Sequence, residues 1–195
     1  MMRIHGVILA GGEGRRMGGA DKALLLLDGR ALVSHAIDRL LPQVEALAIS
    51  ANGEPARLAR FGLPVLPDDR PMGPLSGILA GLRRAAAQGA SHLVSAPVDV
   101  PFLPPDLVPR LLLAAQDRPV VARAGGRLHP VTALWPVTLA PALADFLASG
   151  AKPKVMDFAA AQGAVTADFP DDGAFANVNT PEDLAAAEAL LRGEA

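Results

Sequence analysis

Short apolar runs alternate along this chain with longer segments in which apolar residues recur at helical spacing. The short runs predict buried strands over residues 4–9, 44–51, 63–66 and 92–96. The segments between them predict helices over residues 31–41, 55–61 and 76–88, and a further helix whose first turn holds Pro104 and Pro105. Strands and helices that alternate in this way form mostly parallel sheets covered on both faces. Such sheets bind ligands at the carboxyl ends of their strands.

The pattern changes after Pro119. Apolar runs over residues 120–124 and 128–135 flank Gly125 and Gly126, a pair that favours the tight turn of a β-hairpin. Helices are predicted over residues 138–148 and 154–161, and a last helix begins at Thr180, whose hydroxyl can cap its first turn. We therefore expect an α/β fold, a Rossmann-like three-layer αβα sandwich whose mostly parallel sheet carries an added antiparallel hairpin. The length and the 51% hydrophobic content suit one domain over residues 1–195.

The composition narrows the classes of function. With 19% charged residues and a formal net charge of -2, the chain has no surplus of basic residues for nucleic acid, so an anion site has to be local. The absence of cysteine excludes thiol catalysis and disulfides, and the four histidines are too scattered in sequence to suggest zinc. No segment has the length and apolarity of a membrane span, and the N-terminus lacks the layout of a signal peptide. We expect a cytoplasmic protein with no membrane partner.

The segment from Leu9 to Lys22 reads LAGGEGRRMGGADK. Its glycines expose backbone N–H groups, and Arg15, Arg16 and Lys22 add positive charge, which together suit a polyphosphate. The spacing does not match a P-loop, whose lysine precedes serine or threonine, and it does not match the GxGxxG of a dinucleotide-binding fold. The alternative is an ordinary glycine-rich connection between a strand and a helix.

Asp99 follows the strand over residues 92–96 and lies between Pro97 and Pro101. The prolines restrict the turn and therefore the direction of the carboxylate. A carboxylate at a strand end suits Mg²⁺, which takes its other ligands from water and from substrate phosphates. We interpret Asp99 as a magnesium ligand; the alternative is that it caps the next helix.

Polar residues at two further strand ends suggest a nucleoside pocket. Asn52 follows the strand over residues 44–51, and Asp68 follows the strand over residues 63–66. The GPLSG segment, residues 73–77, comes shortly after Asp68, and its glycines would let a flat ring approach the backbone. Each of these residues is also common in turns for purely local reasons.

Five segments, in this order over nearly the whole chain, resemble the molybdenum cofactor guanylyltransferase family. They are LAGGEGRRMGGADKALLLLDGRALVSH, GPLSG, PVDVPF, LHPVTALWP and FANVNTPEDL. Sugar-phosphate and molybdopterin cytidylyl enzymes share the glycine-rich opening, whereas the doubled glycines before Asp21 and Lys22 look like the guanylyl branch. The resemblance implies transfer of GMP from GTP to the terminal phosphate of molybdopterin that carries molybdenum, with Mg²⁺ as cofactor and pyrophosphate as product. Molybdoenzymes or their chaperones are the protein partners that this activity suggests.

The resemblance also implies roles for individual residues. GTP would contact Leu9, Ala10, Gly11, Lys22, Asn52, Asp68 and Asp99, with Asp99 also binding Mg²⁺. The family associates the regions of Asn177, Asn179, His129, Lys152 and Lys154 with its pterin side. The two asparagines would also suit a turn, and His129 would also suit the interior of a strand. One departure is Val98, where the family often has cysteine.

The implied reaction brings two anions together. The attacking phosphate monoester has a second pKa of about 6, so it is largely dianionic at neutral pH and needs no strong general base. We expect Lys22, Arg15, Arg16 and Asp99 with its metal to offset the repulsion and to act as the catalytic groups. The alternatives are a cytidylyl- or sugar-phosphate nucleotidyltransferase that uses the same loop, or a non-catalytic GTP-binding module in cofactor delivery.

Overall fold

The computed structural model describes residues 2–11, 13–14, 20–67, 72–150, 154–171 and 173–193. Its main feature is a seven-stranded sheet in the order β11-β9-β10-β8-β1-β6-β7. The strands are β1 (Ile4–Leu9), β6 (Ala46–Ser50), β7 (Val65–Leu66), β8 (His92–Pro97), β9 (Val120–Ala124), β10 (Arg127–Pro136) and β11 (Val165–Phe169). Within this sheet, β10 alone runs antiparallel to its neighbours, and the other pairs are parallel.

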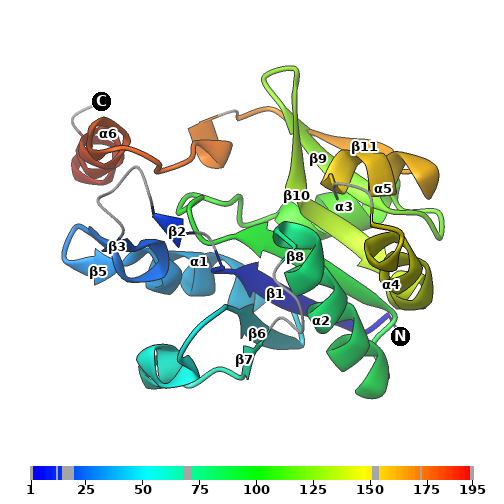
Figure 1. Ribbon diagram of the computed structural model, residues 1–195. Coiled ribbons are helices and arrows are strands. Elements are labelled where there is room, and N and C mark those ends of the chain that lie inside the picture. Colours follow the sequence, from blue (N-terminus) through cyan, green and yellow to red (C-terminus); the bar gives the residue numbers. More distant parts are fainter. Residues whose placement is uncertain are drawn as a thin grey trace.

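Six α-helices are present among the described residues, and all but the last cover the faces of this sheet. They are α1 (Leu32–Leu40), α2 (Pro74–Ala87), α3 (Leu107–Ala114), α4 (Ala140–Ala148), α5 (Val155–Ala161) and α6 (Pro181–Arg192). One apolar cluster joins α1 and α3 to the sheet, and a second joins α2, α4 and α5 to it. Figure 1 accordingly shows α2 and α4 in front of the sheet and α3 behind it. The expected three-layer α/β fold is confirmed.

Short elements connect the sheet to its helices. Two small antiparallel ribbons pair β2 (Glu13–Gly14) with β3 (Ala20–Asp21) and β4 (Leu26–Leu27) with β5 (Arg30–Ala31). Short 3₁₀ segments are η2 (Lys22–Leu24), η3 (Leu41–Gln43), η4 (Pro55–Phe61), η5 (Val137–Leu139) and η6 (Gly173–Phe175); η4 is the longest, with seven residues. Helix α6 lies beside these ribbons (Figure 1) and packs on a separate small apolar cluster that includes Leu27 and Leu32.

The predicted hairpin is present. Gly125 and Gly126 have φ values of 53° and 73°, the left-handed backbone that a two-residue hairpin turn requires at both positions. Its first strand, β9, pairs antiparallel with β10 and parallel with β11. Of the two hairpin strands, only β10 therefore runs against the rest of the sheet. The sequence analysis did not predict β11. This strand lies at the sheet edge and alternates exposed polar residues with buried apolar ones, so no continuous apolar run marks it.

Two helix starts test the capping arguments. Thr180 accepts a hydrogen bond from the backbone of Asp183, and the Asp183 carboxylate accepts one from the backbone of Thr180, so the predicted capping box is confirmed. The expectation that Pro104 and Pro105 occupy the first turn of α3 is wrong, because α3 begins at Leu107 and Asp106 is its N-cap. The Leu107 N–H donates to the Pro104 carbonyl at 3.2 Å, so Pro105 and Asp106 form a turn before the helix, and proline favours the first central position of such a turn.

Candidate functional site

A cavity of about 850 Å³ lies at the carboxyl ends of β1, β6 and β8. The start of α2 and part of β10 complete its wall. The lining residues are Leu9, Gly11, Lys22, Ser50, Asn52, Gly73, Pro74, Gly77, Pro97, Val98, Asp99, Val100, Leu128, His129, Pro130, Val131, Thr132 and Asn177. The glycine-rich segment, the Asn52 turn, the GPLSG segment and the Asp99 turn therefore meet at one place, as the strand-end argument predicted.

The end of β1 is paired on both sides. The Ala10 N–H donates to the Ser50 carbonyl at 2.8 Å, and the Val98 N–H donates to the Leu9 carbonyl at 3.1 Å. Leu9 and Gly11 line the cavity, whereas the side chain of Ala10 is buried in the core and its N–H is already engaged. Ala10 therefore supports this wall of the cavity from the apolar core and does not line the cavity itself.

Helix α2 approaches the end of β1 very closely at Gly77. A Cβ atom at this position would lie 2.5 Å from the Ser50 Oγ and 2.6 Å from the Leu9 Cδ2, so a larger residue would push the helix away. The helix begins after Gly73, which has a φ of 80° and provides no side-chain cap. Gly73, Pro74 and Gly77 line the cavity, so the positive end of the helix dipole lies beside it, where it favours an anion.

A bulge in β10 forms the opposite wall. His129 pairs with Ala122 of β9, but Ala133 pairs with Val121, so Pro130, Val131 and Thr132 leave the ladder and line the cavity. The hydroxyl of fully buried Ser95 donates to the Val131 carbonyl at 2.7 Å and accepts from the Trp135 Nε1 at 2.9 Å. These bonds satisfy polar groups that the bulge would otherwise leave buried without partners. Sequence reasoning did not single out the bulge, although a proline within a strand pattern indicates one.

Lys22 and Asp99 form the charged centre of the cavity. The Lys22 Nζ lies 2.6 Å from the Asp99 Oδ2, and their side chains are only 13% and 14% exposed. The same Nζ donates to the Asn179 Oδ1, and the Asn177 Nδ2 donates to the Asp99 Oδ2 at 3.3 Å. Four predicted site residues from distant parts of the chain are therefore brought into one hydrogen-bonded group.

The second oxygen of Asp99, Oδ1, is buried and has no hydrogen-bond partner among the described residues. A buried carboxylate oxygen without a partner is costly, so this position suits a cation. The described residues contain no group of three or more His, Asp or Glu side chains placed to hold a metal. A single carboxylate still fits Mg²⁺, which often binds through one or two carboxylates, waters and substrate phosphates. The alternative role for Asp99 is wrong, because the N-cap position of the following helix is occupied by Asp106, seven residues farther along the chain.

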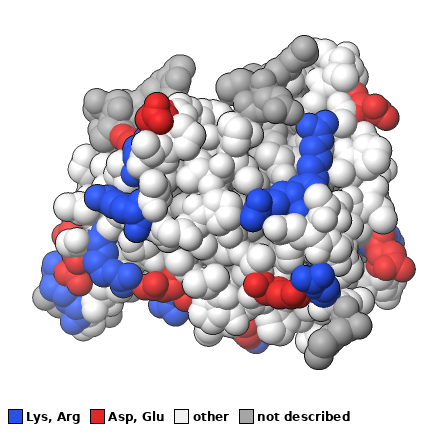
Figure 2. Space-filling model, turned by 90° about the horizontal axis from the view of Figure 1, so that it is seen from below, with Lys and Arg blue, Asp and Glu red and all other residues white. Residues whose placement is uncertain are grey.

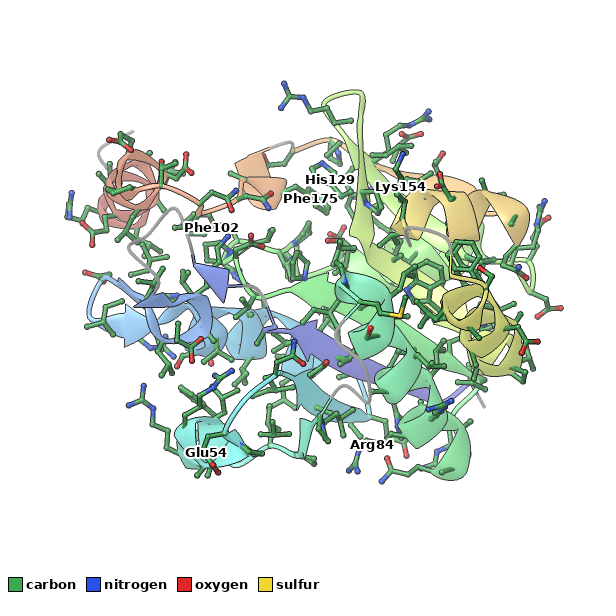
Figure 3. The ribbon with its side chains drawn as sticks, viewed as in Figure 1. Glu54, Arg84, Phe102, His129, Lys154 and Phe175 are labelled. Carbon is green, nitrogen blue, oxygen red and sulfur yellow. The ribbon has the colours of Figure 1, made fainter. Side chains whose placement is uncertain are left out.

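His129 lies on the cavity wall against an aromatic neighbour. Its ring centroid is 4.6 Å from that of Phe175, which in turn lies 5.1 Å from Phe169. Burial lowers the pKa of His129, with a smaller opposing effect from a backbone hydrogen bond at Ala124, and this favours the neutral imidazole. Figure 3 shows His129 and Phe175 side by side. Lys154 is exposed just before α5 and does not line the cavity.

Several predicted residues lie outside the described residues: Arg15, Arg16, Asp68 and Lys152. Asn52 is described and lines the cavity. Its carbonyl accepts a hydrogen bond from Arg57 Nη2 at 2.9 Å, a contact that the sequence analysis did not anticipate. No sequence signal would have found it, since an arginine on a short polar turn is ordinary.

The distribution of charged residues on the face shown in Figure 2 is compatible with a small ligand bound at a local site. In Figure 2, the lysines and arginines of the face seen from below form separate groups, some of them next to acidic residues, with broad uncharged areas between. The described residues of that face form no continuous basic field for a nucleic acid backbone. In the part of the chain that the structure describes, no helix has the length and apolarity to cross a membrane.

Comparisons with known proteins identify similar sequences and a similar fold. The family model of the MobA-like NTP transferase domain matches residues 6–164. A molybdenum cofactor guanylyltransferase from Cereibacter sphaeroides is 63% identical over 194 residues, which cover 100% of both chains. One from Acidiphilium cryptum is 52% identical over 95% of this chain and 94% of its own. Among solved structures, molybdopterin-guanine dinucleotide biosynthesis protein A from Archaeoglobus fulgidus matches with a TM-score of 0.77 at 23% identity, over 97% of this chain and 99% of that chain.

Proposed function

Since this chain belongs to the molybdenum cofactor guanylyltransferase family, we propose that its cavity transfers GMP from GTP to the terminal phosphate of molybdenum-loaded molybdopterin, releasing pyrophosphate. The observation that carries the proposal is the contact of Lys22 with Asp99 at the centre of a cavity with two dissimilar walls. The volume of about 850 Å³ lies in the range of small-molecule sites.

The GTP half of the cavity consists of the β1 and β6 ends and the start of α2. Leu9, Gly11 and Asn52 line it, and the missing side chain of Gly73, where a Cβ would meet no neighbour within 4 Å, leaves room for a flat base beside the backbone. Ala10 supports the segment from the core. Arg15 and Arg16 belong to the same loop, and Asp68 precedes the GPLSG segment, so all three are proposed to contact GTP or its phosphates on the strength of their place in the sequence.

The acceptor half consists of the β10 bulge and the segment before α6. Neutral His129 presents a flat ring backed by Phe175, a surface suited to a fused heterocycle such as the pterin. Asn177 lines this part of the cavity and adds an amide for hydrogen bonding. Lys154 lies farther out, and its proposed role is limited to attracting the anionic acceptor.

The chemistry requires little proton transfer. The acceptor phosphate is already a nucleophile, so the task of the protein is to hold two anions in reacting positions. Asn179 and Asp99 fix the Lys22 ammonium in place before substrate binds, so its charge can stabilise the developing transition state without reorganisation. Asp99 is proposed to hold Mg²⁺ through Oδ1, and the bound ion would neutralise phosphate charge. Arg15 and Arg16 are proposed to stabilise the leaving pyrophosphate.

Pyrophosphate release from purified protein tests this function. The protein is incubated with Mg²⁺ and molybdenum-loaded molybdopterin, and GTP, CTP, UTP and ATP are supplied separately. Of the four nucleotides, only GTP is expected to give rapid pyrophosphate release. Release with GTP should also require molybdopterin. Preference for CTP or UTP would indicate another nucleotidyltransferase, and GTP binding without release would indicate a non-catalytic module; either result would overturn the proposal.

The product has to reach enzymes that use it. We propose that molybdoenzymes or their chaperones receive it from this protein in the cytoplasm. Co-purification with a candidate molybdoenzyme, and cell fractionation, test the two parts of that statement.

A further inference from the structure

Arg57, on turn η4, connects two parts of the GTP half from outside the cavity. Its Nη1 lies 2.5 Å from the Asp21 Oδ2, and its Nη2 donates to the Asn52 carbonyl at 2.9 Å. The side chains of Arg57 and Asp21 are 25% and 26% exposed, so water only partly screens the pair. We propose that Arg57 is a positioning residue for GTP, which holds the end of the glycine-rich segment and the Asn52 turn in a fixed relation. This inference rests on the proposed function.

The contact of Arg57 with Asp21 acts on Lys22. Asp21 uses its other oxygen, Oδ1, to accept from the Ala23 N–H at 3.1 Å, and so caps the turn η2 on which Lys22 lies. Both oxygens of Asp21 are therefore engaged, one by Arg57 and one by η2. Arg57 fixes the carboxylate, the carboxylate fixes the start of η2, and η2 directs Lys22 toward Asp99.

The contact of Arg57 with the Asn52 carbonyl acts on the GTP half of the cavity. Asn52 follows β6 and lines the cavity, and Arg57 holds it by the backbone, leaving its side chain available to a ligand. Turn η4 is itself fixed, because Leu58 is fully buried in the main apolar cluster. A rigid turn therefore supplies the arginine, and its planar guanidinium can bond two partners at once.

The charge of Asp21 adds a second consequence. A carboxylate next to a segment that receives a triphosphate would repel it, and Arg57 neutralises that carboxylate. Loss of Arg57 therefore removes a support and also uncovers a negative charge. Asp21→Asn keeps an oxygen for the Ala23 N–H, but it removes the charge and sets an amide NH₂ against the Arg57 guanidinium. The Arg57 bond to the Asn52 carbonyl remains, so this variant separates loss of the Asp21 contact from loss of the Asn52 contact.

The experiment compares Arg57→Ala, Arg57→Lys, Asp21→Asn and the double variant Arg57→Ala/Asp21→Asn with the intact protein. Arg60→Ala is the matched control, since Arg60 lies on the same turn, is exposed and packs over Phe61. The measurements are kcat and KM for each substrate by pyrophosphate release, GTP affinity by calorimetry without acceptor, and melting temperature.

Arg57→Ala is expected to lower kcat/KM for GTP about tenfold and Asp21→Asn about threefold, the scale of interactions within one network. The double variant should lose less than the product of the two single losses, because Arg57 and Asp21 act through one shared contact, but more than Asp21→Asn, because it also lacks the bond to the Asn52 carbonyl. Arg57→Lys should recover part of the loss, because an ammonium reaches one partner but not both. The KM for molybdopterin, the melting temperature and all parameters of Arg60→Ala should stay close to those of the intact protein.

Unchanged GTP parameters in folded Arg57→Ala would overturn the inference. It would also fail if the two single losses multiplied in the double variant, or if KM rose equally for both substrates. Calorimetry separates this failure from failure of the proposed function. If the intact protein binds GTP but transfers no GMP, the function is wrong, while the role of Arg57 is still decided by GTP affinity.

Discussion

The Nζ of Lys22 lies 2.6 Å from the Oδ2 of Asp99, while the Oδ1 of the same carboxylate is buried without a partner among the described residues. The two oxygens are thus divided between different tasks. Oδ2 positions the lysine and accepts from Asn177, and Oδ1 is left for a cation. One aspartate can therefore support the protein's own ammonium group and a metal ion together.

Replacement of Asp99 tests this division. Asp99→Asn is expected to reduce the rate of GMP transfer at least about a hundredfold, because it removes a preorganised charge at the reacting groups. The rate is measured by single-turnover pyrophosphate release over a range of Mg²⁺ concentrations. Asp38→Asn is the control, since Asp38 forms an exposed ion pair with Arg30. A rate within tenfold of the intact protein would contradict the assignment.

Lys22 is expected to be as important. Lys22→Ala should lower turnover about a hundredfold, and Lys22→Arg should not restore it, because the planar guanidinium cannot replace a compact ammonium between Asp99 and Asn179. Steady-state kinetics and a melting curve check both variants. Near-normal turnover in folded Lys22→Ala would show that the lysine serves the structure alone.

Asn179 contacts Lys22, so its replacement should affect more than pterin binding. Asn179→Ala is expected to lower turnover at saturating substrates about tenfold, since the ammonium loses one of its two acceptors. Molybdopterin binding should weaken as well, with GTP affinity little changed. A loss confined to GTP affinity would contradict this role.

Ser95 supports the β10 bulge. Ser95→Ala leaves the Val131 carbonyl and the Trp135 Nε1 without their buried partner, and is expected to lower the free energy of unfolding by about 2 to 4 kcal/mol. Urea unfolding measures this change. Ser149→Ala removes an exposed hydroxyl and should change stability by less than about 0.5 kcal/mol. Equal effects of the two substitutions would argue against a supporting role for Ser95.

Stability should depend on pH through buried histidines. Burial lowers the pKa of His5 and of His92, so the folded state takes up protons less readily than the unfolded chain, whose histidines titrate near about pH 6.5. The free energy of unfolding should therefore be level above about pH 7.5 and fall as the pH drops below about 6.5. Urea midpoints between about pH 8 and 5 test this expectation.

Three carboxyl groups with lowered pKa values affect stability at lower pH than the histidines do. Hydrogen bonds lower the pKa of Glu45, Asp168 and Asp183, so the stability they add is lost only below their ordinary pKa, near about 4. His5→Gln and His92→Gln should each flatten the slope between pH 7 and 5. A constant midpoint over this interval in the intact protein would show that burial of the histidines does not affect proton uptake.

Local patterns allowed much of the fold to be predicted. The hairpin follows from Gly125 and Gly126, since few other residues adopt left-handed backbone twice in succession, and the start of α6 follows from a threonine with an acid three residues later. Strand β11 escaped prediction because an edge strand needs only one buried face. The error at α3 arose because proline suits the turn that precedes a helix as well as the first turn of the helix itself.

By itself, the sequence determined the types and order of most elements, and the strand ends that carry glycines, Lys22, Asn52 and Asp99. Periodicity and turn chemistry act over a few residues, so a single chain is enough to read them. Only the tertiary structure decided that Asn179 contacts Lys22, that Ser95 supports a bulge and that Arg57 joins Asp21 to Asn52. These contacts connect segments whose approach depends on how helices pack on the sheet, and packing is not encoded in any local pattern.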